Sequence, residues 1–430
     1  MKVIADLHIH SKYSRATSQN MDIPSINRYA QIKGLNVVGT GDFTHPLWLE
    51  NLKKTLTEAS DTSLFCLQGK DQECVHFMLT TEVCTIFGFE GKTRKIHHVI
   101  LTASIEVAEQ INNVLRKKGN LSVDGRPTLS MSAPELVEEI MSVSDDNVIF
   151  PAHAWTPWFS LFGSINGFNS LSDCYQDMTK HIFALETGLS SDPPMNWRLS
   201  ALDNYCFVSN SDSHSPYPYR IGREANVFEL KKLSYHEIVD SIRQRDPKRF
   251  RFTIETNPAY GKYHWTGHRN CNASMPPSES KKLGGRCPVC NRPLTRGVDE
   301  RVEELADRPV SFKPKSSIGY VHLLPLQEII GTILGTENLS TSNIWKIYNS
   351  LIFQFGNEYT VLLDSPLEQL AKIVDPKLAE AIVRVRQDQV TVVPGYDGVY
   401  GKLSLFETKS NELVENEVKH HTQTSLEKFI

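Results

Sequence analysis

Histidine and carboxylate side chains recur at the ends of short apolar segments in the first half of the chain. His8 and His10 lie two residues apart in VIADLHIH, where strand alternation would point both imidazoles to one face. Asp212 and His214 repeat this spacing in SNSDSH. Glu82 lies within the apolar run FMLTTEVCTIFGF, where a carboxylate without a cationic partner would be costly. Imidazole and carboxylate ligands of this kind favour Zn²⁺, Mn²⁺ or Fe²⁺ over an all-oxygen Mg²⁺ site.

Metals bound by such side chains are suited to phosphoester hydrolysis. Clustered cations lower the pKa of a bridging water, present hydroxide to phosphorus and neutralise the leaving oxygen. The sequence contains neither a Ser/His/Asp nucleophile motif nor a glycine-rich phosphate-binding loop that would indicate a competing chemistry. Phosphoester hydrolysis is therefore the reaction that these residues predict.

A second set of ligand-type residues lies after residue 260. His268-x2-Cys271 is followed, after a 15-residue loop, by Cys287-x2-Cys290, which is the spacing of a zinc ribbon or knuckle. The pattern predicts one structural Zn²⁺. His264 remains an alternative to His268 as the fourth ligand.

The composition indicates a globular cytoplasmic protein. Hydrophobic residues make up 40% of the chain and charged residues 22%, which supplies a core and excludes a wholly disordered chain. The net charge of −4 excludes a uniformly basic nucleic-acid binder. No run approaches the ~18 apolar residues of a membrane span, and no apolar leader opens the sequence, so no membrane partner is expected. Five of the eight cysteines lie among apolar residues and are predicted to be reduced: Cys66, Cys74, Cys84, Cys174 and Cys206.

The segment around the predicted zinc site is locally basic. Between Arg249 and Lys315 there are 13 lysines and arginines against seven acidic residues. Arg286 and Arg292, next to the cysteines, are therefore candidate contacts to a DNA phosphate backbone. A solvated basic surface is the alternative interpretation.

Strand-like and helix-like patterns alternate through the first 250 residues. Strands are expected at 3–10, 36–43, 77–89, 95–103, 147–153, 182–188 and 206–214, and helices at 23–34 and 134–143. Repeated units of this kind favour a parallel α/β fold. We expect a barrel rather than an open sheet, because polar residues repeatedly follow the strands, where α/β folds carry their sites.

Four parts are expected along the chain. They are a catalytic domain at 1–250, a zinc-binding basic module at 251–312, a mainly helical domain at 313–408 and a flexible polar tail at 409–430. Helices of the third part are expected at 325–334, 342–352 and 366–386.

The motifs DLHIHSKYS, GDFTHP, TTEV, KIHH, PAHA and SDSH occur in this order within residues 1–250 and resemble those of the PHP (polymerase and histidinol phosphatase) superfamily. The resemblance implies a distorted β/α barrel that binds two or three divalent cations (Zn²⁺, Mn²⁺, Fe²⁺ or Mg²⁺) for phosphoester hydrolysis. It implies that the first metal and the catalytic centre are held by His8, His10, Glu82 and Asp212.

The same resemblance implies further metal ligands. Glu82 would bridge to a second metal, which is completed by His153 and one histidine of the KIHH pair. His97 and His98 face opposite ways on a strand, and the resemblance favours His97. A third metal would be bound by Asp42, His45 and His214. Arg15 occupies a position where many members have an acid or a histidine, which puts the third metal in doubt.

Over nearly the whole chain, the sequence resembles the endonuclease Q family. The barrel motifs are followed by GKYHWTGHRNC, GGRCPVC, RVEELADRP and PGYDGVYGK. This resemblance implies cleavage of the phosphodiester bond 5′ to deaminated bases (uracil, hypoxanthine, xanthine) and to abasic sites in damaged double-stranded or single-stranded DNA.

Aromatic and basic residues follow two of the expected metal-binding loops. An enzyme that senses a base inside a duplex must extrude it and needs aromatic or apolar walls around it. Each aromatic residue taken alone is more often a packing residue, but their attachment to the loops of His153 and His214 favours a DNA cleft. The expected DNA-contacting residues of these loops are Trp155, Trp158, Tyr217 and Arg220.

The last eight residues resemble a sliding-clamp-binding peptide. The pattern Gln-x-x-Leu-x-x-aromatic places two apolar side chains on one side of a single helical turn, ready for an apolar pocket. The expected clamp contacts are Gln423, Leu426, Phe429 and Ile430.

The leading interpretation is a metal-dependent DNA repair endonuclease. A small-molecule phosphatase could use the same barrel but would not need a basic zinc module or a clamp-binding tail. A non-catalytic barrel that serves as a scaffold in a replication or repair complex is the third possibility, which Arg15 leaves open.

Overall fold

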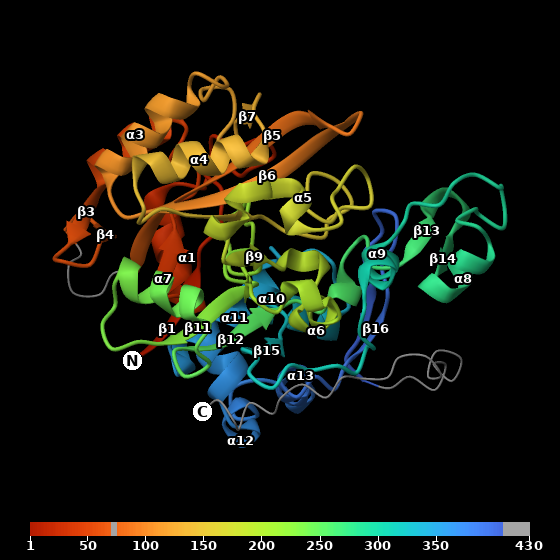
Figure 1. The fold of residues 1–430 in the computed structure, drawn as a ribbon. Coiled ribbons are helices and arrows are strands. Elements are labelled where there is room, and N and C mark those ends of the chain that lie inside the picture. Colours follow the sequence, from red (N-terminus) through yellow and green to blue (C-terminus); the bar gives the residue numbers. More distant parts are fainter. Residues whose placement is uncertain (70–74, 407–430) are drawn as a thin grey trace.

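The computed structural model describes residues 1–69 and 75–406, and a mixed 11-stranded sheet forms its centre (Figure 1). The strands of this sheet are β1 (Lys2–Asp6), β2 (Val37–Gly39), β3 (Leu56–Ala59), β4 (Leu64–Leu67), β5 (His76–Phe89), β6 (Lys92–Thr102), β7 (Thr128–Leu129), β8 (Val148–Pro151), β11 (Ala225–Glu229), β12 (Phe250–Glu255) and β15 (Gly319–His322). The main order is β15-β12-β11-β1-β2-β5-β4-β3, while β6 and β7 pair with β5, and β8 pairs with β6. Three two-stranded sheets accompany it: β9 (Ala184–Glu186) with β10 (Cys206–Val208), β13 (Thr266–His268) with β14 (Ala273–Met275), and β16 (Thr391–Val393) with β17 (Lys402–Ser404).

The predicted α/β class is confirmed, but the expected parallel barrel is not what the described strands form. β1 pairs parallel with β2 but antiparallel with β11, and β5 pairs antiparallel with β6 along its length. The turn between β5 and β6 contains Glu90 and Gly91, both with positive φ, which is the geometry of a tight hairpin turn. The β9–β10 pair is separate from the large sheet, so these strands do not close into a hydrogen-bonded ring.

Helices cover the sheet and extend beyond it. They are α1 (Ile23–Lys33), α2 (Pro46–Thr55), α3 (Ile105–Leu115), α4 (Ala133–Val143), α5 (Leu171–Tyr175), α6 (Pro193–Trp197), α7 (Tyr235–Gln244), α8 (Pro277–Lys282), α9 (Val298–Leu305), α10 (Leu326–Leu334), α11 (Ser342–Phe355), α12 (Leu367–Leu370) and α13 (Pro376–Arg386). α3 and α4 lie over β5 and β6, while β13, β14 and α8 form a small lobe that protrudes from the body (Figure 1). None of the described helices is long and apolar enough to cross a membrane.

Local capping explains where several helices begin and end. The Asp22 side chain accepts a hydrogen bond from the Ser25 N–H at the start of α1, and Gly34 ends that helix with a φ of 95°. A capping box between Ser132 and Glu135 starts α4. The expected helices at 23–34 and 134–143 are therefore confirmed.

The C-terminal region differs from its predicted pattern in one element. The single helix expected at 366–386 is wrong, because α12 ends at Leu370 and α13 begins at Pro376. The Asp375 side chain caps the new helix at the Lys377 N–H, and proline has no N–H with which to continue a preceding one. β12 pairs with β11 on one side and with β15 on the other, so the central sheet crosses the expected boundaries at residues 250 and 312.

A buried ion pair ties the C-terminal helices to the N-terminal half of the chain. The Lys33 side chain, which is 1% exposed, donates to Glu358 Oε1 at 2.7 Å and to the Pro218 carbonyl at 2.8 Å. Glu358 also accepts from the Tyr348 hydroxyl at 2.8 Å and from the Leu326 N–H at 3.0 Å. Because Pro218 lies in the segment that follows β10, Glu358 supports that loop through Lys33 of α1.

One cysteine departs from the predicted reduced state. Cys66 in β4 is disulfide-bonded, so the prediction is wrong at that position. Cys84, Cys174 and Cys206 are free and buried, as expected, because they pack among apolar neighbours. Cys74 lies outside the described residues.

A second charged contact crosses from the sheet to the C-terminal helices and predicts a pH dependence of stability. His322 Nε2 lies 3.2 Å from Asp192 Oδ2, and His322 Nδ1 lies 3.4 Å from Asp388 Oδ2. Burial alone would lower the pKa of His322, but the contacts with Asp192 and Asp388 outweigh it and raise this pKa to about 10. Since the pKa is higher in the folded state, the stabilisation is fully present below about pH 6.5 and is lost as the pH rises through about 10.

We therefore expect the unfolding free energy of the wild type to fall between pH 7 and pH 10, and this fall to be much smaller in His322→Gln. Urea unfolding of both proteins across this range measures the difference. His236→Gln, at an exposed histidine, is the matched control. An equally steep fall in His322→Gln would assign the pH dependence to other groups.

Candidate active site

His97 lies within β6, and the other histidines and the aspartates of the predicted site lie on loops that follow strands. β1 ends at Asp6 and β10 ends at Val208, so the expected strands at 3–10 and 206–214 are too long. The two loops are nevertheless side by side, because the His10 N–H donates to the Ser213 carbonyl at 2.9 Å. The structure thus brings together the sequence-distant motifs DLHIH and SDSH at one end of the sheet.

Four of the predicted ligands form the first cluster. His10 Nε2 lies 3.2 Å from Glu82 Oε2 and 3.0 Å from Asp212 Oδ1. His8 Nε2 lies 3.6 Å from the same Glu82 oxygen and 3.7 Å from the same Asp212 oxygen. One donor atom from each residue lies within 4.8 Å of every other, as a shared cation requires.

Buried atoms without hydrogen bonds support a cation in this cluster. His8 Nε2, His10 Nε2 and Asp212 Oδ1 are buried, and within the described part of the chain none of them has a partner with the geometry of a hydrogen bond. Leaving three such atoms unsatisfied would be costly, whereas a divalent cation accepts all three as ligands. The residues present therefore fit a metal.

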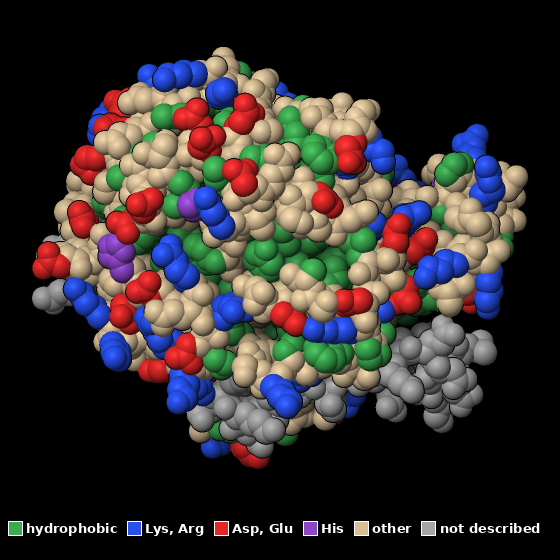
Figure 2. Space-filling view, in the orientation of Figure 1, with side chains coloured by type: hydrophobic (Ala, Val, Ile, Leu, Met, Phe, Trp, Pro, Cys, Tyr) green, Lys and Arg blue, Asp and Glu red, His purple; other side chains and the backbone are tan. Residues whose placement is uncertain are grey.

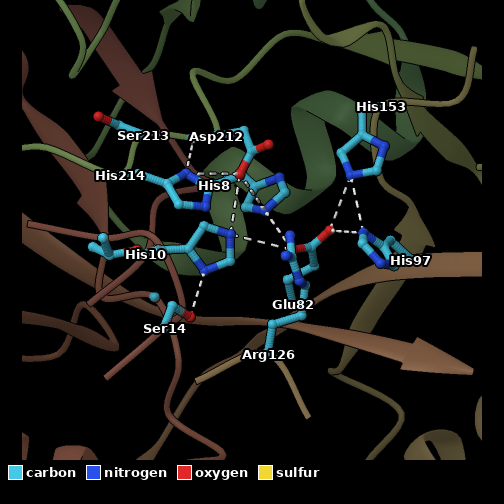
Figure 3. Close-up of polar contacts among 12 residues, drawn as sticks. His8, His10, Ser14, Glu82, His97, Arg126, His153, Asp212, Ser213 and His214 are labelled. Carbon is cyan, nitrogen blue, oxygen red and sulfur yellow. Dashed lines mark hydrogen bonds and ion pairs between the residues drawn. The ribbon is translucent and has the colours of Figure 1, made fainter. Parts of the chain in front are cut away.

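Glu82 joins the first cluster to a second one. Its Oε1 atom lies 2.8 Å from His97 Nδ1 and 3.1 Å from His153 Nε2, while its Oε2 atom faces His8 and His10. Figure 3 shows the carboxylate between the two sets of histidines. Glu82, His97 and His153 form a second group with metal-binding geometry. A carboxylate with one oxygen toward each set is placed to bridge two cations.

The structure distinguishes His97 from His98. His97 belongs to the second cluster, whereas His98 Nδ1 contacts the Tyr175 hydroxyl at 3.0 Å and His98 Nε2 contacts Thr85 Oγ1 at 3.0 Å. Burial lowers the pKa of both histidines, that of His97 to about 4 and that of His98 to about 3. His98 is therefore a neutral packing residue on the opposite face of β6.

The residues expected to bind a third metal do not converge within the described chain. Asp42 Oδ1 contacts His10 Nδ1 at 2.9 Å, and Asp42 Oδ2 accepts from the Ser11 N–H and hydroxyl, so this carboxylate orients His10. His45 Nε2 faces the Ser122 carbonyl at 3.3 Å, and His214 Nδ1 faces the Asp212 carbonyl at 2.8 Å. Arg15 is exposed and pairs with Asp124.

Three of the predicted metal ligands adopt unusual backbone angles. Asp42, His153 and Asp212 have φ values of 49°, 30° and 47° in the left-handed region. Such conformations cost of order 1–3 kcal/mol each and persist where the surrounding structure fixes them, often at functional sites.

Glu186, which was not predicted from the sequence, contacts both clusters. It lies at the end of β9 and is 0% exposed. Its two oxygens lie 3.0 Å from His8 Nδ1, and Oε2 also accepts from the His153 N–H at 2.8 Å. The one available signal was a carboxylate directly after the apolar residues FAL, at a strand end like the other site residues.

Arg126 is a second site residue that was not predicted from the sequence. Its Nη1 atom donates to Glu82 Oε2 at 3.0 Å, and its side chain is 26% exposed (Figure 3). It follows Asp124 and Gly125 in a turn, where an arginine is unremarkable in sequence.

The electrostatics of the site keep its carboxylates charged. Burial raises the pKa of Glu82, but His97 and Arg126 outweigh it and hold that pKa well below its usual range. Burial likewise raises the pKa of Asp212, and contact with His10 and the charge of His8 reverse the shift. The pKa values of His8 and His10 are raised, against burial, by Glu186 and Asp42 respectively. Protons on these two histidines thus supply the positive charge that a bound cation would bring.

The four predicted zinc ligands also come together. His268, Cys271, Cys287 and Cys290 form one group in the protruding lobe, with His268 Nδ1 3.4 Å from Cys290 Sγ. His264 is not part of this group. Desolvation would raise the pKa of Cys287, but backbone N–H groups of Cys290 and Val289 and the His268 side chain lower it to about 6. A thiolate at neutral pH is the form that binds Zn²⁺.

Replacing Cys287 with serine is expected to remove one zinc per chain while leaving the metals of the Glu82 site in place. Serine keeps the size of the side chain but provides no thiolate. Elemental analysis of the purified holoprotein measures this. Val289→Ser, at a 70% exposed position between the two cysteines, should keep its full zinc content. Unchanged zinc in Cys287→Ser would argue against this ligand set.

Among the predicted DNA-contacting residues, Trp155 needs a correction. It is 0% exposed, packs on Phe162 with ring centroids 4.6 Å apart and donates from Nε1 to Asn196 at 2.8 Å. It is therefore a core residue, because its polar atom and its ring are both satisfied internally. Trp158 is 38% exposed and makes an edge contact with Tyr263.

The remaining predicted contacts lie at the surface or near it. Tyr217 and Tyr219 are half-buried and stack at 5.9 Å, and Arg220 lies over the Tyr219 ring. Arg286 and Arg292 are exposed on the protruding lobe, where Figure 2 shows several lysine and arginine side chains. The predicted clamp contacts Gln423, Leu426, Phe429 and Ile430 lie outside the described residues.

Comparisons with known proteins give close matches over most of the chain. Residues 325–389 match the family model described as the MJ0043 C-terminal domain. Protein MJ0043 of Methanocaldococcus jannaschii is 34% identical over 257 residues, which cover 59% of this chain and 31% of that protein, so the match spans about a third of that relative.

Two solved structures match almost end to end. One is the lesion-specific endonuclease PfuEndoQ of Pyrococcus furiosus, with 35% identity, a TM-score of 0.83, and coverage of 94% of this chain and 95% of that one. The other is endonuclease Q in complex with a 27-mer duplex substrate that has an abasic lesion at the active site. It shows 35% identity, a TM-score of 0.83, and coverage of 96% and 100%.

Proposed function

This chain belongs to the endonuclease Q family, and from that premise we propose that it is a metal-dependent DNA repair endonuclease. It hydrolyses the phosphodiester bond 5′ to deaminated bases (uracil, hypoxanthine and xanthine) and to abasic sites. The observation that carries the proposal is the Glu82 carboxylate, whose two oxygens face two separate sets of buried histidines.

The residues of the site hold the reacting groups in place. His8, His10 and Asp212 on one side and His97 and His153 on the other, with Glu82 shared by both sets, would hold cations that would supply Lewis acidity for attack on phosphorus. Glu186 and Asp42 accept from the Nδ1 atoms of His8 and His10, which leaves each Nε2 directed at the cluster.

A small-molecule phosphatase and a non-catalytic scaffold are less well supported as functions of this chain. A non-catalytic scaffold has no need for buried, unsatisfied ligand atoms at His8, His10 and Asp212. A phosphatase has no need for the exposed arginines of the protruding lobe, which suit phosphate-backbone contacts.

The test is a nicking assay with purified full-length protein and Mn²⁺ or Mg²⁺. End-labelled duplexes carry one uracil, hypoxanthine, xanthine or abasic site, or no lesion. We expect a metal-dependent nick immediately 5′ of the lesion and none on the intact duplex. The Asp212→Asn variant serves as the inactive control. Turnover of a small phosphate monoester without nicking would favour the phosphatase instead.

We also propose a sliding clamp as partner, bound through residues 423–430. The support is the Gln-x-x-Leu-x-x-aromatic pattern alone. Removing these residues should abolish capture by an immobilised clamp, while nicking of a short duplex stays close to that of the full chain. Retained capture would place the clamp contact elsewhere.

A further inference from the structure

Arg126 is a charged residue beside the metal-binding cluster that is not itself one of the metal ligands. Its guanidinium donates to Glu82 Oε2, the oxygen that also faces His8 and His10. It also lies close enough to Asp212 for their charges to interact. An arginine cannot bind a metal, since it remains protonated and has no free lone pair to offer.

The loop that presents Arg126 is fixed from both sides. The Gly125 N–H donates to the Tyr13 carbonyl at 3.0 Å, and the Pro127 carbonyl accepts from the Cys84 N–H at 2.9 Å. A Cβ atom at Gly125 would lie 2.3 Å from Asp42 Oδ2 and 2.4 Å from Ser14 Oγ, so only glycine allows this close approach. The guanidinium is therefore aimed at the cluster by an anchored backbone.

The contact between Arg126 and Glu82 uses only part of the guanidinium. Its Nη1 atom makes the one side-chain hydrogen bond that the described residues give it, and a carboxylate that binds cations can keep accepting that bond. The remaining N–H donors lie at the rim of the cluster on a side chain that is 26% exposed. The planar fork of a guanidinium matches two oxygens of a phosphate group, and it carries a permanent charge.

From this geometry we propose that Arg126 is a catalytic residue that donates hydrogen bonds to a non-bridging oxygen of the scissile phosphate. During in-line attack on a phosphodiester, negative charge grows on the non-bridging oxygens. A donor placed there stabilises the transition state more than the bound substrate. The proposal rests on the proposed function for its substrate, but the phosphate contact can also be tested separately.

The first measurement is the single-turnover nicking rate of metal-loaded wild type, Arg126→Ala and Arg126→Lys at saturating DNA. We expect Arg126→Ala to lose about 100- to 1,000-fold in rate, as for other single transition-state donors, with metal content per chain unchanged. Arg126→Lys should recover part of the rate, because it keeps the charge but not the fork. Arg15→Ala, which removes a 77% exposed arginine paired with Asp124, should keep the wild-type rate at saturation.

The second measurement uses the two phosphorothioate diastereomers at the scissile position. Sulfur at the oxygen that Arg126 contacts should slow the wild type but add little further loss in Arg126→Ala, because the contact is already gone. An identical sulfur effect in both proteins, or loss of metal from Arg126→Ala, would overturn the proposal and reduce Arg126 to a partner of Glu82.

The third measurement does not depend on DNA. Binding of inorganic phosphate to the metal-loaded protein, followed by titration calorimetry, should be weaker in Arg126→Ala than in the wild type and Arg15→Ala. If the wild type failed to nick any lesion but showed this difference, the proposed function would fall and the phosphate contact would stand. Equal phosphate binding by all three proteins would count against the contact itself.

Discussion

Replacing Glu82 with glutamine is expected to abolish metal-dependent nicking and to deplete both metal clusters together. Glu82 Oε2 lies 3.2 Å from His10 Nε2 and Oε1 lies 2.8 Å from His97 Nδ1, so each oxygen serves a different set of histidines. An amide has only one oxygen, and its NH₂ group would face one of the two sets with donors where a cation belongs. The loss should exceed the roughly 100-fold expected for a residue that merely orients a ligand.

Single-turnover nicking and elemental analysis of the same preparation measure this outcome. Glu50→Gln, an exposed glutamate of α2 paired with Lys54, is the matched control for the loss of one carboxylate. If Glu82→Gln lost one metal and kept the other, the carboxylate would belong to a single cluster. Wild-type activity with full metal content would contradict the assignment altogether.

Replacing Glu186 with glutamine is expected to weaken metal binding about 10- to 100-fold, the usual effect of removing a carboxylate that orients a histidine ligand. Glu186 is 0% exposed and contacts His8 Nδ1 with both oxygens while it accepts from the His153 N–H. The single oxygen of glutamine can accept from His8 Nδ1 or from the His153 N–H, and its NH₂ group then faces the other donor. Unlike Glu82, Glu186 contributes no atom to either cluster.

A Mn²⁺ titration of the nicking rate separates these two roles. Glu186→Gln should need more Mn²⁺ for half-maximal rate and recover most of its rate at saturation. Glu224→Gln is a closely matched control, because Glu224 is likewise 0% exposed but accepts from the Ser209 hydroxyl and the Thr256 N–H and contacts no histidine of the clusters. An unchanged Mn²⁺ dependence in Glu186→Gln would mean that other contacts suffice to orient His8.

Much of the site could be predicted because its residues follow apolar strands. His8, His10, His153 and Asp212 each come directly after such a segment, and their placement follows from the way strand ends gather at one side of a sheet. The residues alone left His97 and His98 open and only the family resemblance favoured His97, since both lie on β6 and only their surroundings differ.

The residues that were missed have no local signal. Glu186 and Arg126 acquire their roles through contacts with His8 and Glu82, which are 178 and 44 positions away in the chain. Trp155 shows the converse error, because its place after His153 suggested a cleft, while the Asn196 side chain completes a buried environment for it.

In the fold, too, the elements with a nearby sequence signal could be predicted, and those that depend on residues far apart in the chain could not. The capping residues of α1 and α4 lie within a few positions of each helix end, so both helices could be predicted correctly from the sequence. The antiparallel β5–β6 hairpin and the break before Pro376 also have local signals, in Glu90-Gly91 and Asp375-Pro376, which the longer apolar patterns concealed. The separation of β9 and β10 from the main sheet depends on distant pairing and has no such signal.

The buried pair of Lys33 and Glu358 limits how this enzyme can be taken apart. A truncated chain that ended before Glu358 would leave Lys33 without its carboxylate, and breaking a buried pair by removing one partner costs about 3–5 kcal/mol. The lost support extends to the Pro218 carbonyl, six positions after Asp212. The catalytic half is therefore a poor candidate for a portable nuclease cassette, and a fusion that uses it should carry residues 1–406 as one piece.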